Sequence, residues 1–227
     1  MIKQRGFTLI EIAIAVVVIG LLLSSLLGPL SVRIEQADRQ ETQALLDEIK
    51  EALYGFAVTN GRLPCPDTDT PGDGGEDLAG PPPQQCSSPS GTLPSANLGV
   101  ARMDAWGRPF AYRVTAFFAD EDPTSVGGGG CVQTSATTSI ALCSVADIFV
   151  KDGAAGSNVA ANVLAVIVSY GANRGVTPIS PDEGENSPPS DVNFVSTGYR
   201  QDPANDLVAW ISPHILKNRM IAAGRLP

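Results

Sequence analysis

The first thirty residues carry the strongest hydrophobic pattern in the chain. Residues Phe7–Leu30 read FTLIEIAIAVVVIGLLLSSLLGPL, which is apolar throughout except for small polar residues and one carboxylate, Glu11. A helix over this run is about 36 Å long, enough to cross the hydrocarbon core of a bilayer. A short basic stretch with Lys3 and Arg5 precedes it. We therefore predict a membrane-spanning helix over residues 7–30.

The pattern changes after residue 30, and the helix is predicted to continue with one apolar face. Charged residues alternate there with apolar residues at helical spacing, which predicts packing of that face on a sheet. Gly61 and Pro64 end the helix. The residues of the apolar face are Leu45, Ile49, Ala52, Leu53 and Phe56.

Short apolar segments further along the chain predict the strands of one small antiparallel sheet. Asn162–Tyr170 reads NVLAVIVSY, and its continuous run of β-branched residues predicts the central strand, buried on both faces. Asp206–Ile211 is predicted to be an edge strand, followed by a short helix that starts at Ser212 and Pro213. The other predicted strands are Pro109–Phe118, Ile140–Val145 and Asp147–Lys151.

A loop rich in proline, glycine and acidic residues occupies residues 61–95. Hard cations such as calcium bind clustered carboxylate oxygens. The EF-hand spacing is absent, however, because Pro71 takes a ligand position and no glutamate closes the loop. We therefore expect a solvated acidic loop. Its acids are Asp67, Asp69, Asp73, Glu76 and Asp77.

The composition suits one modest domain outside the cytoplasm. The 227 residues carry a net charge of −9, with 23 glycines and 18 prolines, which indicates a loop-rich fold. Such acidity argues against nucleic acid as a partner, because phosphate neutralisation drives nucleic-acid binding.

The four cysteines all follow the apolar segment and are predicted to form disulfides. An even number of cysteines in an exported domain favours disulfides, whereas zinc sites usually show paired C-x-x-C spacing or several histidines. Three pairings are possible, and we predict the pairing of sequence neighbours. The predicted bonds are Cys65–Cys86 and Cys131–Cys143.

The N-terminal stretch has three possible interpretations: a secretory signal peptide, a signal anchor, and a third that depends on the residues around Glu11. A secretory signal peptide has a shorter apolar core than this one, and Glu11 falls where that core should begin. An ordinary signal anchor fits the length but leaves Glu11 without a role. The stretch RGFTLIE, from Arg5 to Glu11, instead resembles the prepilin leader of type IV pilins and type II secretion pseudopilins. Gly6, Phe7 and Glu11 match that motif in register.

This resemblance implies a route into the membrane and then into a filament. A prepilin peptidase would cut between Gly6 and Phe7, and Phe7 would be N-methylated. Removal of the leader takes the net charge from −9 to −11. In the filament, Glu11 would pair with the N-terminal amine of a neighbouring subunit, since a buried charge is tolerated only with a partner. The alternative is that Glu11 extends to the lipid headgroups and has no role in assembly.

Two further stretches resemble the same family. The segment from Asp104 to Tyr112 resembles the pseudopilin signature Asp-Pro-Trp-Gly-Asn-Pro-Tyr-x-Tyr, although Ala105 and Arg108 depart from it. The matching residues are Asp104, Trp106, Gly107, Pro109 and Tyr112, which we interpret as structural, with Trp106 covering the core. The loop after Tyr170 resembles a calcium loop of the major pseudopilins, which makes four acids candidate ligands. These are Asp182, Glu183, Glu185 and Asp191.

No enzymatic function is predicted. A serine or cysteine nucleophile would need the single histidine, His214, which falls in the first turn of the predicted terminal helix. The chain contains no G-x-S-x-G motif, and we predict no catalytic residues and no cofactor apart from calcium.

These observations predict an α+β, pilin-like fold: a long N-terminal helix packed on a small antiparallel sheet with long disulfide-bonded loops. The predicted parts are a leader (1–6), a membrane and assembly helix (7–30), its amphipathic continuation (31–60) and a periplasmic head (61–227). The predicted function is that of a pseudopilin or minor pilin, held in the bacterial inner membrane and then in a filament or at its tip. Its predicted partners are prepilin peptidase, other subunits and an inner-membrane assembly platform. The alternative is an anchored periplasmic binding module that does not polymerise, in a form that either depends on calcium or does not.

Overall fold

The computed structural model describes residues 8–121, 140, 142, 144–172, 180–187, 191–197 and 206–226, with the side chains of residues 23–31 left aside. The chain divides into two compact units, Met1–Gln40 and Glu41–Pro227. We call them unit one and unit two. The predicted part boundaries at residues 6, 30 and 60 are not tested by this division and stay predictions.

Helix α1, Leu9–Asn60, is a single helix of 52 residues that begins in unit one and ends in unit two. It stops where the sequence predicts. Gly61 has a φ of 75°, a left-handed conformation that glycine adopts without strain, and its N–H donates to the carbonyl of Ala57 at 2.8 Å.

The main sheet of unit two has four strands in the order β3-β4-β7-β9, and every neighbouring pair is antiparallel. Strand β7 lies inside the sheet and all five of its residues are buried, as the sequence predicts. The bounds are Ser90–Thr92 for β3, Ala111–Val114 for β4, Ala165–Ser169 for β7 and Leu207–Ile211 for β9.

A second, three-stranded sheet has the order β6-β5-β8, and here β5 and β8 run parallel. We call it the outer sheet. Its strands are Ile148–Lys151 (β5), Asn158–Val163 (β6) and Asn193–Val195 (β8). Two short strands, Leu78–Ala79 (β1) and Gln85–Cys86 (β2), form a hairpin. The remaining helices are α2 (Ser95–Leu98), η1 (Ala116–Phe118), α3 (Pro181–Asn186) and α4 (Pro213–Ala222).

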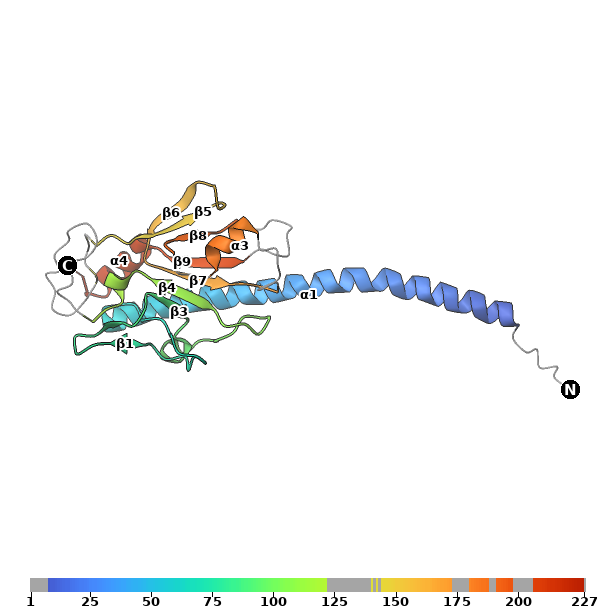
Figure 1. Ribbon diagram of the computed structural model, residues 1–227, viewed down its shortest axis with the longest axis horizontal. Helices are drawn as coiled ribbons and strands as arrows, with labels where there is room; N and C mark the ends of the chain where they lie inside the picture. The colour runs from blue at the N-terminus through green and yellow to red at the C-terminus, as the bar shows by residue number, and fades with distance from the viewer. Residues whose placement is uncertain are drawn as a thin grey trace. The chain divides into compact units, whose positions relative to one another are not determined.

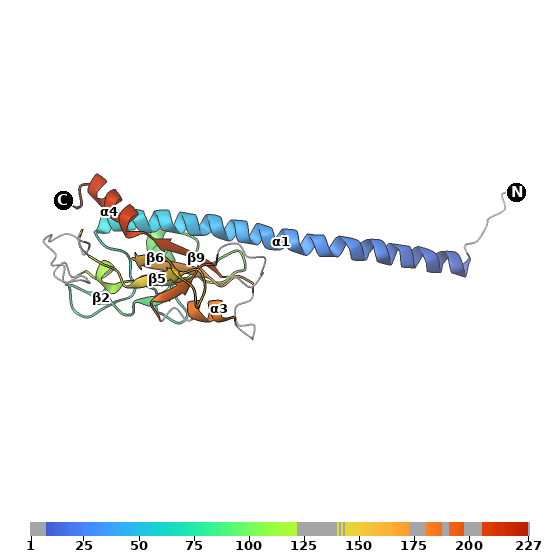
Figure 2. The ribbon, with the colours of Figure 1, turned by 90° about the horizontal axis from the view of Figure 1, so that it is seen from above.

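The main sheet is buried on both faces, by α1 on one side and by the outer sheet on the other (Figures 1 and 2). Because side chains alternate along a strand, Ala165 and Ile167 of β7 face the cluster that contains α1, whereas Val166 and Val168 face the cluster of the outer sheet. The α1 side of the first cluster is formed by Leu46, Ile49, Leu53, Tyr54 and Ala57. The outer sheet contributes Ile148, Val150, Val163 and Phe194 to the second.

The strand predictions are confirmed in part. Strands β5, β7 and β9 lie within predicted segments, with β9 at a sheet edge. Two predictions are too long. The segment Pro109–Phe118 contains β4, which ends at Val114 because the chain then turns into η1. Asn162 and Val163 belong to β6, which ends before Leu164. No strand is assigned among the described residues of the predicted segment Ile140–Val145.

The disulfide prediction is confirmed for the pair that the structure describes. Cys65 and Cys86 are bonded and their Cα atoms lie 5.2 Å apart. Cys131 and Cys143 lie outside the described residues. The architecture is thus α+β, with an N-terminal helix, chiefly antiparallel sheets and a disulfide.

Replacing both Cys65 and Cys86 by serine is expected to lower the free energy of unfolding by about 3 kcal/mol, because the bond closes a loop between residues 21 apart in sequence. Urea denaturation of the full chain in detergent, with and without the double substitution, measures this. An unchanged unfolding midpoint would contradict the prediction. Changing both cysteines together avoids a new free thiol.

Candidate functional site

The predicted cleavage and methylation residues, Gly6 and Phe7, lie outside the described residues, which begin at Thr8. Thr8 precedes the first turn of α1. Its hydroxyl accepts from the backbone N–H of Glu11 at 3.4 Å and its carbonyl accepts from the same N–H at 3.0 Å. Thr8 therefore stands where a helix N-cap residue stands.

Glu11 lies in the first turn of α1, exposed to solvent. A carboxylate at this end of a helix is favoured by the partial positive charge of the unpaired N–H groups. Its neighbours are apolar and also exposed: 88% of Leu9, 68% of Ile10 and 56% of Ile12 is accessible. A charged group surrounded by uncovered apolar side chains indicates a surface that another molecule covers.

The exposed apolar surface continues along unit one. Every described residue from Leu9 to Leu22 is exposed, and Val32 and Ile34 are exposed as well. Within the described residues, no helix is both long enough and apolar enough to cross a membrane.

The predicted signature forms a tight turn built on Asp104, which is only 6% exposed. Its Oδ1 atom accepts from the backbone N–H groups of Trp106 at 3.0 Å and Arg108 at 2.9 Å. Its Oδ2 atom accepts from the hydroxyl of Ser169, at the end of β7, at 2.6 Å. The carboxylate thus closes the turn and fastens it to the main sheet.

The other signature residues have different structural places. Gly107 has a φ of 72°, which explains the glycine, and Pro109 forms an isolated bridge with Met103. Tyr112 is fully buried and its hydroxyl donates to the carbonyl of Pro64 at 3.2 Å. Trp106 is partly buried and is not among the residues of the two core clusters, and its role in covering the core stays a prediction.

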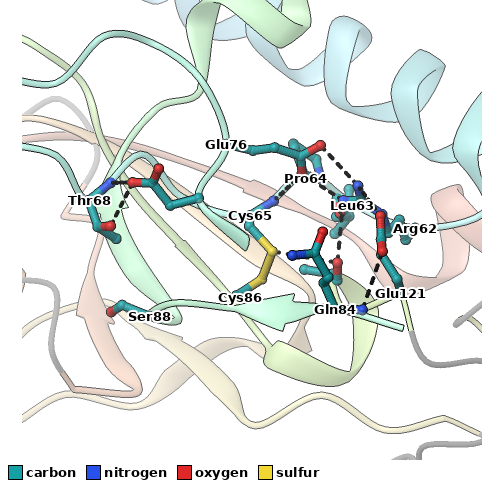
Figure 3. Close-up of a disulfide and its surroundings, with 12 residues drawn as sticks. Arg62, Leu63, Pro64, Cys65, Thr68, Glu76, Gln84, Cys86, Ser88 and Glu121 are labelled. Carbon is teal, nitrogen blue, oxygen red and sulfur yellow. Dashed lines mark hydrogen bonds and ion pairs between the residues drawn. A yellow bond between two sulfur atoms is a disulfide. The ribbon is translucent and has the colours of Figure 1, made fainter. Parts of the chain in front are cut away.

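A buried ion pair holds the disulfide-bonded loop to the end of α1 (Figure 3). Arg62 donates to both oxygens of Glu76, at 2.7 and 2.9 Å, and their side chains are 11% and 12% exposed. Glu76 also accepts from the N–H of Cys65 at 3.1 Å, and Glu121 lies 3.6 Å from Arg62. Burial lowers the pKa of Arg62, but the hydrogen bond and the charge of Glu76 outweigh burial and raise it overall.

The expectation of a solvated acidic loop holds only for Asp69 and Asp73, which are exposed. Asp67 is 1% exposed and accepts from the N–H groups of Asp69 at 3.1 Å and Gly74 at 2.7 Å. Asp77 accepts from the N–H and the hydroxyl of Thr68, both at 2.6 Å, and these bonds lower its pKa. Asp67, Glu76 and Asp77 therefore act as internal acceptors that order a loop with little regular structure.

Three of the four candidate calcium ligands, Asp182, Glu183 and Asp191, accept hydrogen bonds from the chain itself. Asp182 accepts from the N–H of Ala154 at 2.7 Å, and Glu183 completes a capping box with Ser180. Asp191 accepts from the backbone N–H of Asn193 at 2.9 Å, and Glu185 lies half-buried in α3. Among the described residues, no three His, Cys, Asp or Glu side chains form a group that could hold a metal ion.

A buried amide, Asn186, joins α3 to β8 and to the start of β9. Its side chain accepts from the N–H of Val195 at 2.8 Å and donates to the carbonyl of Val195 at 3.0 Å. It also donates to Asp206 at 3.0 Å, while its main-chain carbonyl accepts from the hydroxyl of Tyr170 at 3.0 Å. Burial raises the pKa of Asp206 to about 7, the charge of Glu183 adds to this, and the hydrogen bond from Asn186 opposes it.

His214 is exposed in the first turn of α4, where the sequence places it, and no hydrogen bond or ion pair of its side chain is recorded among the described residues. The pairs Arg62–Glu76 and Asn186–Asp206 were not predicted, because nothing in the sequence spacing relates residues that meet only after the loops fold.

The described residues thus combine a long helix, whose N-terminal part is apolar and exposed, with an α+β head. Residues 1–27 match the family model of the prokaryotic N-terminal methylation motif. This match confirms the resemblance to prepilin-type sequences predicted from Gly6, Phe7 and Glu11.

Similar proteins are found among the type II secretion system core proteins G. The chain is 37% identical to that of Pectobacterium carotovorum subsp. carotovorum over 62 residues, which are 27% of this chain and 40% of the relative. It is 39% identical to that of Klebsiella pneumoniae over 62 residues, 27% of this chain and 44% of the relative. The match to that of Aeromonas hydrophila is 26% identical over 128 residues, 56% of this chain and 85% of the relative.

The chain thus spans about two fifths of the length of the first two curated relatives. No solved structure matches it. The relatives are named as core proteins of a secretion system, which supports the prediction that the chain is a structural subunit and not an enzyme.

Asp206→Asn is expected to flatten the pH dependence of stability between pH 4 and 7. The folded pKa of Asp206, about 7, exceeds its ordinary value of 3.8, so the folded chain binds more protons there than the unfolded chain. Stability therefore falls as the pH rises through this window, by up to roughly 4 kcal/mol. Thermal unfolding from pH 4 to 8 should show the variant to be more stable than the wild type at pH 8, with the two converging near pH 4.

Asp191→Asn is the matched control, because the hydrogen bonds from Asn193 lower the pKa of Asp191. That variant should lose stability at neutral pH and converge with the wild type only as the pH falls below 4. If both variants respond in the same direction, the raised pKa of Asp206 is wrong.

Proposed function

We propose that this chain is a pseudopilin-like structural subunit that prepilin peptidase processes and that assembles through the exposed apolar part of α1. The filament serves type II secretion or a related pilus-like system. The observation that carries this proposal is the methylation motif over residues 1–27, which runs directly into a helix whose apolar side chains are uncovered. The similarity to the type II secretion system core proteins G supports the same proposal.

Before assembly, the apolar residues of unit one would lie in the inner membrane, with unit two in the periplasm. Lipid would then cover the side chains from Leu9 to Leu22, whose exposure to water is unfavourable by about 25 cal/mol for each Å² of apolar surface. During assembly the same side chains would exchange lipid for the helices of neighbouring subunits. An inner-membrane assembly platform and other pilin-like subunits are the proposed partners.

Glu11 would fix the stagger between neighbouring helices. A carboxylate among apolar side chains is unfavourable in a lipid or protein interior unless a positive charge lies beside it. The amine created by cleavage before Phe7 would lie at the same end of the helix as Glu11, in the segment that neighbouring subunits share. One relative position of two helices would then pair the two charges, and other positions would leave both unpaired.

The second candidate function is an anchored periplasmic binding module that does not polymerise. Its calcium form depends on Asp182, Glu183, Glu185 and Asp191, and calcium binding by these residues stays a prediction. The hydrogen bonds that Asp182, Glu183 and Asp191 accept within the chain give each of these carboxylates a role without a metal. The filament subunit is therefore the better-supported proposal.

The chain isolated from its host membrane is expected to start at Phe7 and to carry one methyl group on its N-terminal amine. Intact mass and N-terminal sequencing measure both changes. A chain that still starts at Met1 in cells with an active prepilin peptidase would contradict the proposal and favour the binding module.

Glu11→Leu is expected to reduce filament assembly at least tenfold, because it leaves the neighbouring amine buried without a partner. Sheared filaments pelleted from cells that overproduce the system give the yield. Asp69→Asn is the matched control, since Asp69 is an exposed carboxylate in the head. Normal filaments from the Glu11 variant, with cleavage intact, would show that Glu11 has no role in assembly.

A further inference from the structure

Thr42 is a polar residue of α1 with 0% exposure, two residues after the boundary between unit one and unit two. Among the described side chains of α1, it is the first buried one from the N-terminal end. Its hydroxyl oxygen accepts from the backbone N–H of Ala105 at 3.2 Å. Several hydrogen bonds between described residues join α1 to the rest of the head. This one lies nearest to the N-terminal end of the helix.

Ala105, which donates to Thr42, lies in the turn that the Asp104 carboxylate closes. Ala105 follows Asp104, whose carboxylate closes the turn through the N–H groups of Trp106 and Arg108. The same carboxylate accepts from Ser169 at the end of β7, the strand inside the main sheet. A continuous path thus runs from the helix through Thr42, the turn and Asp104 to the sheet. We call this path the Thr42 joint.

Apolar packing alone does not fix the place where the helix meets the head. The buried stripe of α1 begins one turn later, at Leu46, and continues through Ile49 and Leu53. Hydrophobic burial has no preferred direction, so a stripe of similar side chains tolerates small sliding and rotation. A hydrogen bond between two buried groups has a defined length and angle, and losing one partner leaves the other unsatisfied.

We infer that Thr42 and Asp104 are positioning residues for assembly, which hold the first turn of α1 in unit two at a fixed place on the head. This inference rests on the proposed function, because a filament repeats one contact between identical subunits. Each subunit must then hold this end of the helix on its head in the same way. If the Thr42 joint is lost, the first turn of α1 in unit two opens, while the packing from Leu46 onward keeps the head folded.

Thr42→Val in the full chain tests the inference, because valine keeps the shape of threonine and removes the acceptor. In detergent, amide hydrogen exchange of residues 41–46 should become at least tenfold faster, with exchange in β7 unchanged. Filament yield should fall at least fivefold, although cleavage before Phe7 continues. Thr42→Ser, which restores the hydroxyl, should recover both values.

Two further variants sharpen the test. Ser169→Ala removes the donor to Asp104 from the far side of the turn and should speed exchange over the same residues. Thr59→Val is the matched control, since the hydroxyl of Thr59 donates only to the carbonyl of Gly55 within α1, at 2.9 Å. It should change neither exchange at residues 41–46 nor filament yield.

The outcomes separate this inference from the proposed function. Normal filaments or unchanged exchange in Thr42→Val would overturn the inference and leave the proposed function intact. Faster exchange throughout the head, β7 included, would also overturn it, since Thr42 would then support only the overall fold. If the wild-type chain is neither cleaved nor assembled, the proposed function fails, and the inferred role in assembly fails with it.

Discussion

The packing of one apolar stripe of α1 on the main sheet is the interaction on which the rest of the head depends. Leu46, Ile49, Leu53 and Ala57 are at most 1% exposed and contact the face of the sheet that carries Tyr112. Burial of each large side chain contributes roughly 1.5–3 kcal/mol. The same helix has no such one-sided burial between Leu9 and Leu22, where every residue is exposed. A single helix therefore carries two different surfaces, one buried against the main sheet and one apolar and exposed.

Polar groups at defined places give this packing its precision. The Asp104 carboxylate fastens a turn to β7, Arg62 and Glu76 hold the disulfide-bonded loop, and Asn186 connects α3 to β8. Each of these groups is buried or nearly so, and each has its partners. A buried polar group without a partner is unfavourable by about 1–3 kcal/mol, so each of these contacts favours one arrangement of the chain over close alternatives. Loops of little regular structure can in this way be as well defined as strands.

The sequence predicted the elements whose signal is local. The β-branched run of β7, the glycine that ends α1 and the Ser212–Pro213 start of α4 are each visible in a few neighbouring residues. The outer sheet was largely missed because its strands carry little pattern. In β6 most residues are exposed, and β8 has only three residues, which pair with a parallel neighbour far away in sequence.

In the candidate site, too, the sequence predicted contiguous motifs but not contacts between residues far apart in the chain. The motif from Gly6 to Glu11 is a contiguous signal and was found, and the Asp104 turn was found for the same reason. The hydrogen bonds of this turn were not predicted. Ser169 bonds Asp104 and Thr42 bonds Ala105, and each pair is more than sixty residues apart in sequence. The acidic loop was misread in the same way: Asp67 looks solvated in sequence, but the backbone of the folded loop surrounds it with N–H donors.

If the chain assembles through its helix, as proposed, it also has to avoid association through its sheets. Exposed strand edges present unpaired N–H and C=O groups, which recruit strands from other chains. Here Asn186 occupies both the N–H and the C=O of Val195 on β8, and Asp67 exchanges two backbone hydrogen bonds with Thr92 on β3. Strand β6 pairs with β5 through register shifts, which disturb the regular edge that an incoming strand needs. The edges of β8, β3 and β6 are thus blocked or irregular, which disfavours association through these three strands and is consistent with the proposed assembly through α1.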